Sequence, residues 1–103
     1  MKGTLLSAVT ATGAGSATNL LRPLKRFSVT VTWSGTAPTN TVVSLDGSED
    51  GTNFAALSTQ TITASGTIFH VDVKPVIALK GNFVSKSGGD GTTAVTITFM
   101  AVE

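Results

Sequence analysis

The sequence predicts an all-β protein, an antiparallel and jelly-roll-like β-sandwich of about seven to eight short strands. Apolar residues alternate with Ser and Thr along several segments, which is the period-2 pattern of half-buried strands. Turns rich in Gly, Asp, Asn and Ser separate these segments. The chain has 103 residues and no cysteine, so we expect one domain over residues 1–103 that depends on a good core or on association with other copies.

The first half of the chain predicts two strands with a long connection between them. Residues 5–12 are β-prone and are predicted to form a strand. A signal peptide is not expected here, because the interspersed Ser and Thr are poor for a translocation signal. Residues 13–16 read as a flexible linker and residues 19–25 as a connection, since Pro23 lacks a ladder donor. The clearest alternation covers residues 27–33. We find no convincing helix in the sequence, because Pro23 lies inside the only Leu-rich window with helical spacing.

The second half predicts more strands, separated by turns. These strands cover residues 41–45, 54–58, 59–63, 67–73, 76–85 and 95–102. Pro75 is expected to end the strand 67–73. Within that strand Phe69 belongs to one face, whereas Ile68, His70 and Asp72 belong to the other.

The charge of the chain is low and nearly balanced. Charged residues make up 13% of it, whereas an ordinary globular domain has roughly 25%. The net charge of +1 gives no long-range attraction to nucleic acid or to an anionic membrane. No apolar run reaches the roughly 18 residues of a membrane span. We therefore expect a homo-oligomer, a trimer or dimer, or a component of an assembly, with no nucleic-acid or membrane partner.

Two groups of side chains could carry chemistry. His70, the only histidine, shares a strand face with Asp72, which would suit a base and its orienting group. No nucleophile motif accompanies them, so we expect a surface or interface pair and no enzyme. Asp46, Glu49 and Asp50 crowd one turn. This turn could be a calcium loop, but a hairpin turn is favoured, so we expect no metal and no cofactor.

Three cations and one tryptophan are the remaining candidates for binding. Arg22, Lys25 and Arg26 form the only local basic cluster and are the predicted partner-binding residues. Residues 1–26 are accordingly a possible partner-contacting segment, and we expect residues 1–18 to be dispensable for the sandwich. Trp33 could be a platform for a sugar ring, but its phase with its strand neighbours favours the core.

Three further lysines are expected to be outward charges on strands and edges that discourage aggregation. They are Lys74, Lys80 and Lys86.

Residues 43–54 carry a resemblance to known proteins. They read Val-Ser-Leu-Asp-Gly-Ser-Glu-Asp-Gly-Thr-Asn-Phe. This turn resembles the Ser-x-Asp-Gly turn of discoidin-like carbohydrate-binding β-sandwiches. It also resembles a Gly-Ser-x-Asp-Gly-Thr-Asn-aromatic turn of small tailed-bacteriophage virion proteins, whose short, cysteine-free and weakly charged chains resemble this one more.

The second resemblance implies a virion structural protein. Its preferred role is a capsid decoration (cement) protein that binds and reinforces the phage head, and a head-fibre or tail accessory protein is also implied. Its partners would be the major capsid protein or other virion proteins, and it would be assembled into the virion in the host cytoplasm. The alternative is a carbohydrate-binding module of a phage tail or adhesin.

Overall fold

The computed structural model describes residues 1–102, and within them it contains strands and no helix. The strands are β1 (Lys2–Val9), β2 (Gly13–Ala14), β3 (Thr18–Ser34), β4 (Pro38–Ser48), β5 (Ala55–Ile62), β6 (Thr67–Gly88) and β7 (Ala94–Val102). Every strand pair is antiparallel. The predicted all-β, antiparallel sandwich is therefore confirmed.

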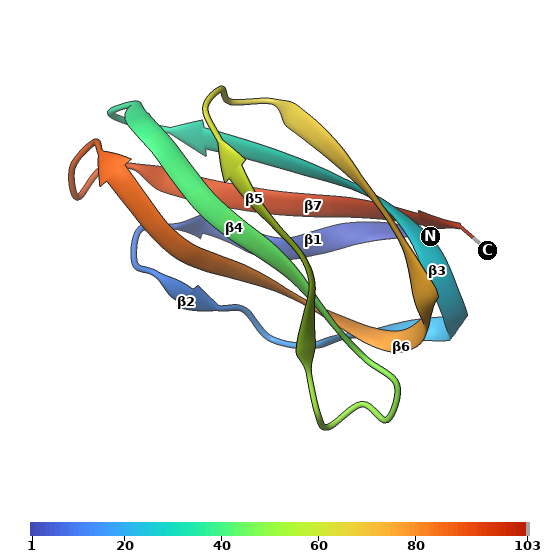
Figure 1. Ribbon diagram of the computed structural model, residues 1–103. Helices are drawn as coiled ribbons and strands as arrows, with labels where there is room; N and C mark the ends of the chain where they lie inside the picture. Colours follow the sequence, from blue (N-terminus) through green and yellow to red (C-terminus); the bar gives the residue numbers. More distant parts are fainter. Residues whose placement is uncertain (103) are drawn as a thin grey trace.

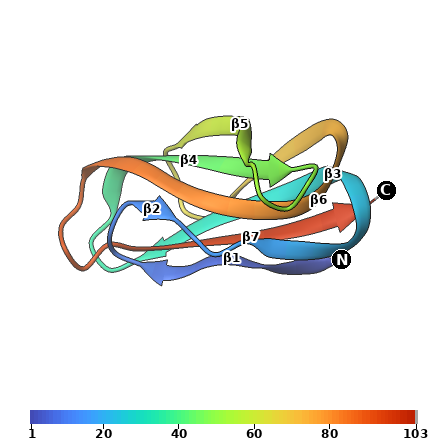
Figure 2. The ribbon, with the colours of Figure 1, turned by 90° about the horizontal axis from the view of Figure 1, so that it is seen from below.

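One sheet folds over on itself to make the two layers of the sandwich (Figures 1 and 2). Its strand order is β1-β7-β3-β6-β4-β5, and β2 also pairs with β6. Residues 26–31 of β3 pair with the first part of β6, whereas residues 18–19 pair with Leu79 and Ala78 further along. The first layer thus holds β1, β7 and the adjoining parts of β3 and β6. The second layer holds β2, β4, β5 and the remaining parts of β3 and β6.

Both prolines that were expected to interrupt strands lie inside strands. Pro23 belongs to β3 and Pro75 to β6, where the two strands bend from one layer into the other. The pairing is irregular there, with register shifts on both sides of Leu24. Proline is tolerated at such a position because the ladder is already disrupted. The prediction of a connection over residues 19–25 and of a strand end at Pro75 is therefore wrong, and two strands are longer than expected.

The core lies between the layers and is built from the alternating apolar positions. Its fully buried side chains are contributed by all the long strands and include Val29, Val31, Val43, Leu45, Leu79, Phe83, Val95 and Ile97. Trp33 is partly buried and packs against this core. The predicted core position of Trp33 is confirmed.

The N-terminal strand is part of the sandwich. β1 pairs with β7 and buries Leu5 and Leu6. A side chain on Gly81 of β6 would place its Cβ 2.8 Å from the Cβ of Leu5, so glycine permits this close contact between the layers. The Met1 ammonium donates a hydrogen bond to the carbonyl oxygen of Ala101 over 3.0 Å. These residues therefore contribute to the core, and we now expect deletion of residues 1–18 to destabilise the sandwich.

Candidate functional site

The outward-facing side chains of the first layer form a regular grid. The strand register aligns Lys2 with Met100, Met100 with Ser28, and Ser28 with His70. The neighbouring row consists of Thr4, Thr98, Thr30 and Ile68. Directly opposite residues of antiparallel strands project to the same side of a sheet. We call these two rows, together with the adjoining Val102, Arg26 and Asp72, the outer face.

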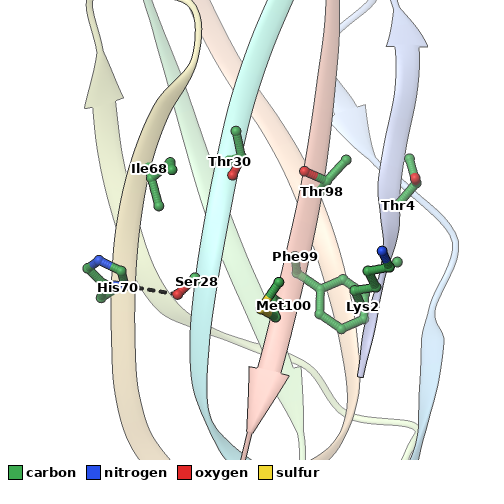
Figure 3. Close-up of a pocket in the computed structure, with 10 residues that line it drawn as sticks. Lys2, Thr4, Ser28, Thr30, Ile68, His70, Thr98, Phe99 and Met100 are labelled. Atoms are coloured by element: carbon green, nitrogen blue, oxygen red, sulfur yellow. Dashed lines mark hydrogen bonds between the residues drawn. The ribbon is translucent and has the colours of Figure 1, made fainter.

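The outer face is open and carries exposed apolar side chains. A hollow of about 660 Å³ runs over both rows, and Figure 3 shows the side chains that line it. Ile68 is 57% exposed, Met100 56% and Val102 54%. Three threonines, Thr4, Thr30 and Thr98, also line the hollow. A surface of this kind suits contact with another surface better than it suits enclosure of a small substrate.

Ser28 and His70 make a direct contact on the outer face. Ser28 Oγ and His70 Nδ1 are 3.0 Å apart, as the dashed line in Figure 3 marks. A Ser–His contact could begin a nucleophilic pair. However, β3 is paired on both sides, with β6 and with β7, so the backbone amides near Ser28 serve the ladders and not an oxyanion. The contact is best described as a cross-strand hydrogen bond.

The partner of His70 differs from the one that the sequence suggested. The hydrogen bond of His70 reaches across to Ser28, and Asp72 lies opposite Arg26. Residues opposite each other on paired strands are about 5 Å apart, whereas residues i and i+2 of one strand are nearly 7 Å apart. The cross-strand neighbour is therefore nearer than the neighbour on the same strand, and sequence spacing alone could not identify it.

The structure divides the predicted basic cluster between two places. Arg22 and Lys25 line a hollow of about 260 Å³ together with Pro23 and Pro75, at the bends of β3 and β6. Arg26 lies on the outer face, in the row of Val102 and Asp72, and lines a hollow of about 320 Å³. The bend thus brings Arg22 and Lys25 together and turns Arg26 onto the adjacent surface.

Leu21 is a candidate contact residue that sequence reasoning missed. Its side chain is 92% exposed, although Leu20 and Leu24 beside it are buried. Leu21, Lys2 and Arg22 border a hollow of about 430 Å³. The alternation of Leu20 and Leu21 inside a strand would have placed Leu21 outward, but the segment was interpreted as a connection because of Pro23.

In the acidic turn, the Asp50 carboxylate is hydrogen-bonded to other groups of the same turn. Asp50 accepts hydrogen bonds from the backbone amides of Asn53 and Thr52, from the Asn53 side chain and from the Ser48 hydroxyl. These bonds, the one from the Asn53 amide first, hold the pKa of Asp50 well below its usual value. Within residues 1–102 no three His, Cys, Asp or Glu side chains lie together in a way that could hold a metal ion. The geometry is that of a self-bonded turn between β4 and β5.

Two of the outward lysines have partners within the chain. Lys80 Nζ lies 4.3 Å from the centroid of the Phe54 ring, which follows the acidic turn. Lys86 Nζ donates a hydrogen bond to the carbonyl oxygen of Asp90. Lys74 is exposed at the bend of β6. Lys80 and Lys86 therefore help to hold loops, a role that the sequence did not predict.

The chain was compared with models of protein families and with curated proteins. A scan against models of protein families found no match, and a search of curated proteins found none either. Residues 1–102 also contain no helix long and apolar enough to cross a membrane.

Proposed function

We propose that this protein is a structural protein of a tailed-phage virion, and that it decorates the capsid and reinforces the head. The observation that carries the proposal is the outer face, an open sheet surface on which Ile68, Met100 and Val102 are each more than half exposed. Such a surface gains stability when a neighbouring protein covers it.

The character of the whole chain supports the same role. Only 13% of the residues are charged, which is low for a domain that remains free in solution. The turn after β4, Gly-Ser-Glu-Asp-Gly-Thr-Asn-Phe, resembles the turn of small phage virion proteins. In this turn the Asp50 carboxylate holds the hairpin through hydrogen bonds within the chain, which suits a structural role.

The mechanism would be attachment of many identical copies at symmetric positions. The outer face would pack against the major capsid protein, another virion protein or a second copy, and a closed dimer or trimer would match the symmetry axes of a shell. A stable contact of this type buries about 800 Å² on each partner. Assembly would take place in the host cytoplasm.

The alternative is a carbohydrate-binding module of a phage tail or adhesin. Its best sequence candidate was Trp33, which packs against the core and so offers little free ring surface for a sugar. No observation on the outer face favours a sugar over a protein surface. We therefore keep this alternative as an outcome of the test.

Electron microscopy with gold-labelled antibodies would test the proposal on particles purified from the lysate in which the protein is made. Label spread over the heads is the expected result. Label confined to the tail tip would overturn capsid decoration and bring the carbohydrate-binding alternative forward. Absence of label from the particles would overturn the virion role altogether.

A further inference from the structure

Most of the positive charge of the chain lies at one end of the sandwich. Five of its seven Lys and Arg residues belong to this end, which we call the basic corner: Lys2, Arg22, Lys25, Arg26 and Lys74. Figure 1 shows the N-terminus and the bends of β3 and β6 on the same side of the molecule. Asp72 shares a row with Arg26, and the acidic turn after β4 adjoins the bend of β6, since Ser48 pairs with Ala78. The basic corner therefore gathers most of the cations of a chain whose net charge is only +1.

Leu21 lies within the basic corner. It is 92% exposed and borders the hollow that Lys2 and Arg22 also line. Single exposed leucines are common on protein surfaces, but this one borders the same hollow as two cations. Arg22 lines this hollow and also a second hollow, which Lys25 lines as well. The corner thus presents the exposed side chains of Leu21 and Met1 beside hollows and positive charge.

We propose that the basic corner docks on an acidic protein surface of the virion, with Leu21 inserted into an apolar depression bordered by carboxylates. This inference rests on the proposed function and names the chemistry of the partner. Complementary charge would orient the encounter and raise its rate. An apolar side chain buried at the centre of a polar rim is the usual arrangement of an interface hot spot.

Two other anionic partners fit the corner less well. A nucleic acid would use the cations, but it offers no apolar depression for Leu21, and the corner has no aromatic residue on which bases could stack. An anionic membrane would accept Leu21, but one leucine beside Met1 provides little apolar area for interfacial binding. An acidic protein surface would pair with the cations and would also offer Leu21 an apolar depression.

The test measures binding of purified wild-type protein and variants to particles stripped of it. Leu21→Ser removes the apolar projection, and Lys25→Glu reverses one charge. The matched controls are Val84→Ser, an exposed apolar residue in the other layer, and Thr59→Glu with Thr61→Glu, which changes the net charge by the same amount on β5. The same proteins are added to vesicles containing phosphatidylserine and to double-stranded DNA.

We expect each corner variant to weaken binding to the particles at least tenfold, and each control to leave it unchanged. Wild-type binding to tails and not heads, with the same sensitivity, would overturn capsid decoration and leave the corner proposal standing. Corner variants that bind as the wild type does would overturn the corner proposal alone. It would also be overturned if the wild type bound vesicles or DNA in preference to particles, or failed to bind particles at all.

Discussion

Buried threonines of this sandwich differ in whether their hydroxyl groups have partners. Thr93 donates a hydrogen bond to the carbonyl oxygen of Thr36 and accepts one from the amide of Asp90. The Oγ1 of Thr41 is buried and has no hydrogen-bond partner within residues 1–102. An unsatisfied buried polar group costs about 1–3 kcal/mol, whereas a satisfied one contributes about 1 kcal/mol. The two residues should therefore respond in opposite ways to loss of the hydroxyl.

We expect Thr41→Val to raise the free energy of unfolding by about 1 kcal/mol, because the buried hydroxyl is replaced by a methyl group of similar size. Thr93→Val should lower it by about 1–3 kcal/mol, because the Asp90 amide and the Thr36 carbonyl lose their partner. Urea denaturation of both variants measures the difference. Equal destabilisation by the two substitutions would contradict this account of Thr41.

Asp50 should make the stability of the fold depend on acid pH. Its pKa is lower in the folded state, so it stabilises the protein at pH values above its unfolded pKa. Since an unfolded Asp has a pKa of about 3.9, this contribution is lost progressively as the pH falls below about 4. Asp50→Asn should therefore lower Tm at pH 7 and reduce the fall in Tm between pH 7 and acid pH.

Glu49→Gln is the matched control for this measurement. It removes the same charge from the same turn, but it leaves the hydrogen bonds to the Asp50 carboxylate in place. Thermal melts that show equal pH dependence in Asp50→Asn and in the wild type would contradict the role of Asp50.

At the scale of elements, the bends in β3 and β6 determine where the surfaces lie. Each strand belongs to both layers, so the residues around Pro23 and Pro75 form a corner and not a loop. The alternation of residues 27–33 was visible in the sequence because it depends only on local phase. The sequence did not show that β3 and β6 continue through their prolines, because this depends on how each strand pairs with its neighbours in the sheet.

The first strand should be essential for the fold. We expect Leu5→Ala and Leu6→Ala each to lower the free energy of unfolding by about 2–5 kcal/mol, because both side chains are buried against the core. Leu21→Ala should change it by less than about 0.5 kcal/mol, because Leu21 is 92% exposed. Chemical denaturation of the three variants tests this contrast. An N-terminal segment that docks only on a partner would instead leave all three equally stable.

At the scale of the whole molecule, the outer face and the basic corner are continuous. Arg26 belongs to the basic corner and shares a row of the outer face with Val102 and Asp72. A partner could therefore cover both surfaces, or two partners could divide them. The sandwich is compact, with a radius of gyration of 13.0 Å, so the two surfaces lie close to each other.

Substitution of the exposed apolar residues should separate folding from assembly. We expect the double variant Ile68→Thr with Met100→Thr to fold as the wild type does, since both side chains are more than half exposed. Its attachment to particles, measured by co-sedimentation, should fall at least tenfold because apolar contact area is lost. Val84→Thr is the control on the other layer. Undiminished attachment of the double variant would show that the outer face is not the contact surface.

The sequence by itself determined the fold class. It also placed Trp33 on the core side of its strand and Ile68 and His70 on the outward side of theirs. These features follow from alternation along a single strand, and alternation is a local property. Only the tertiary structure decided that Ser28 contacts His70, that Lys80 lies over the Phe54 ring and that the exposed Leu21 lies beside cations. Each of these depends on the register between strands distant in sequence, which packing of the two layers fixes and no local pattern specifies.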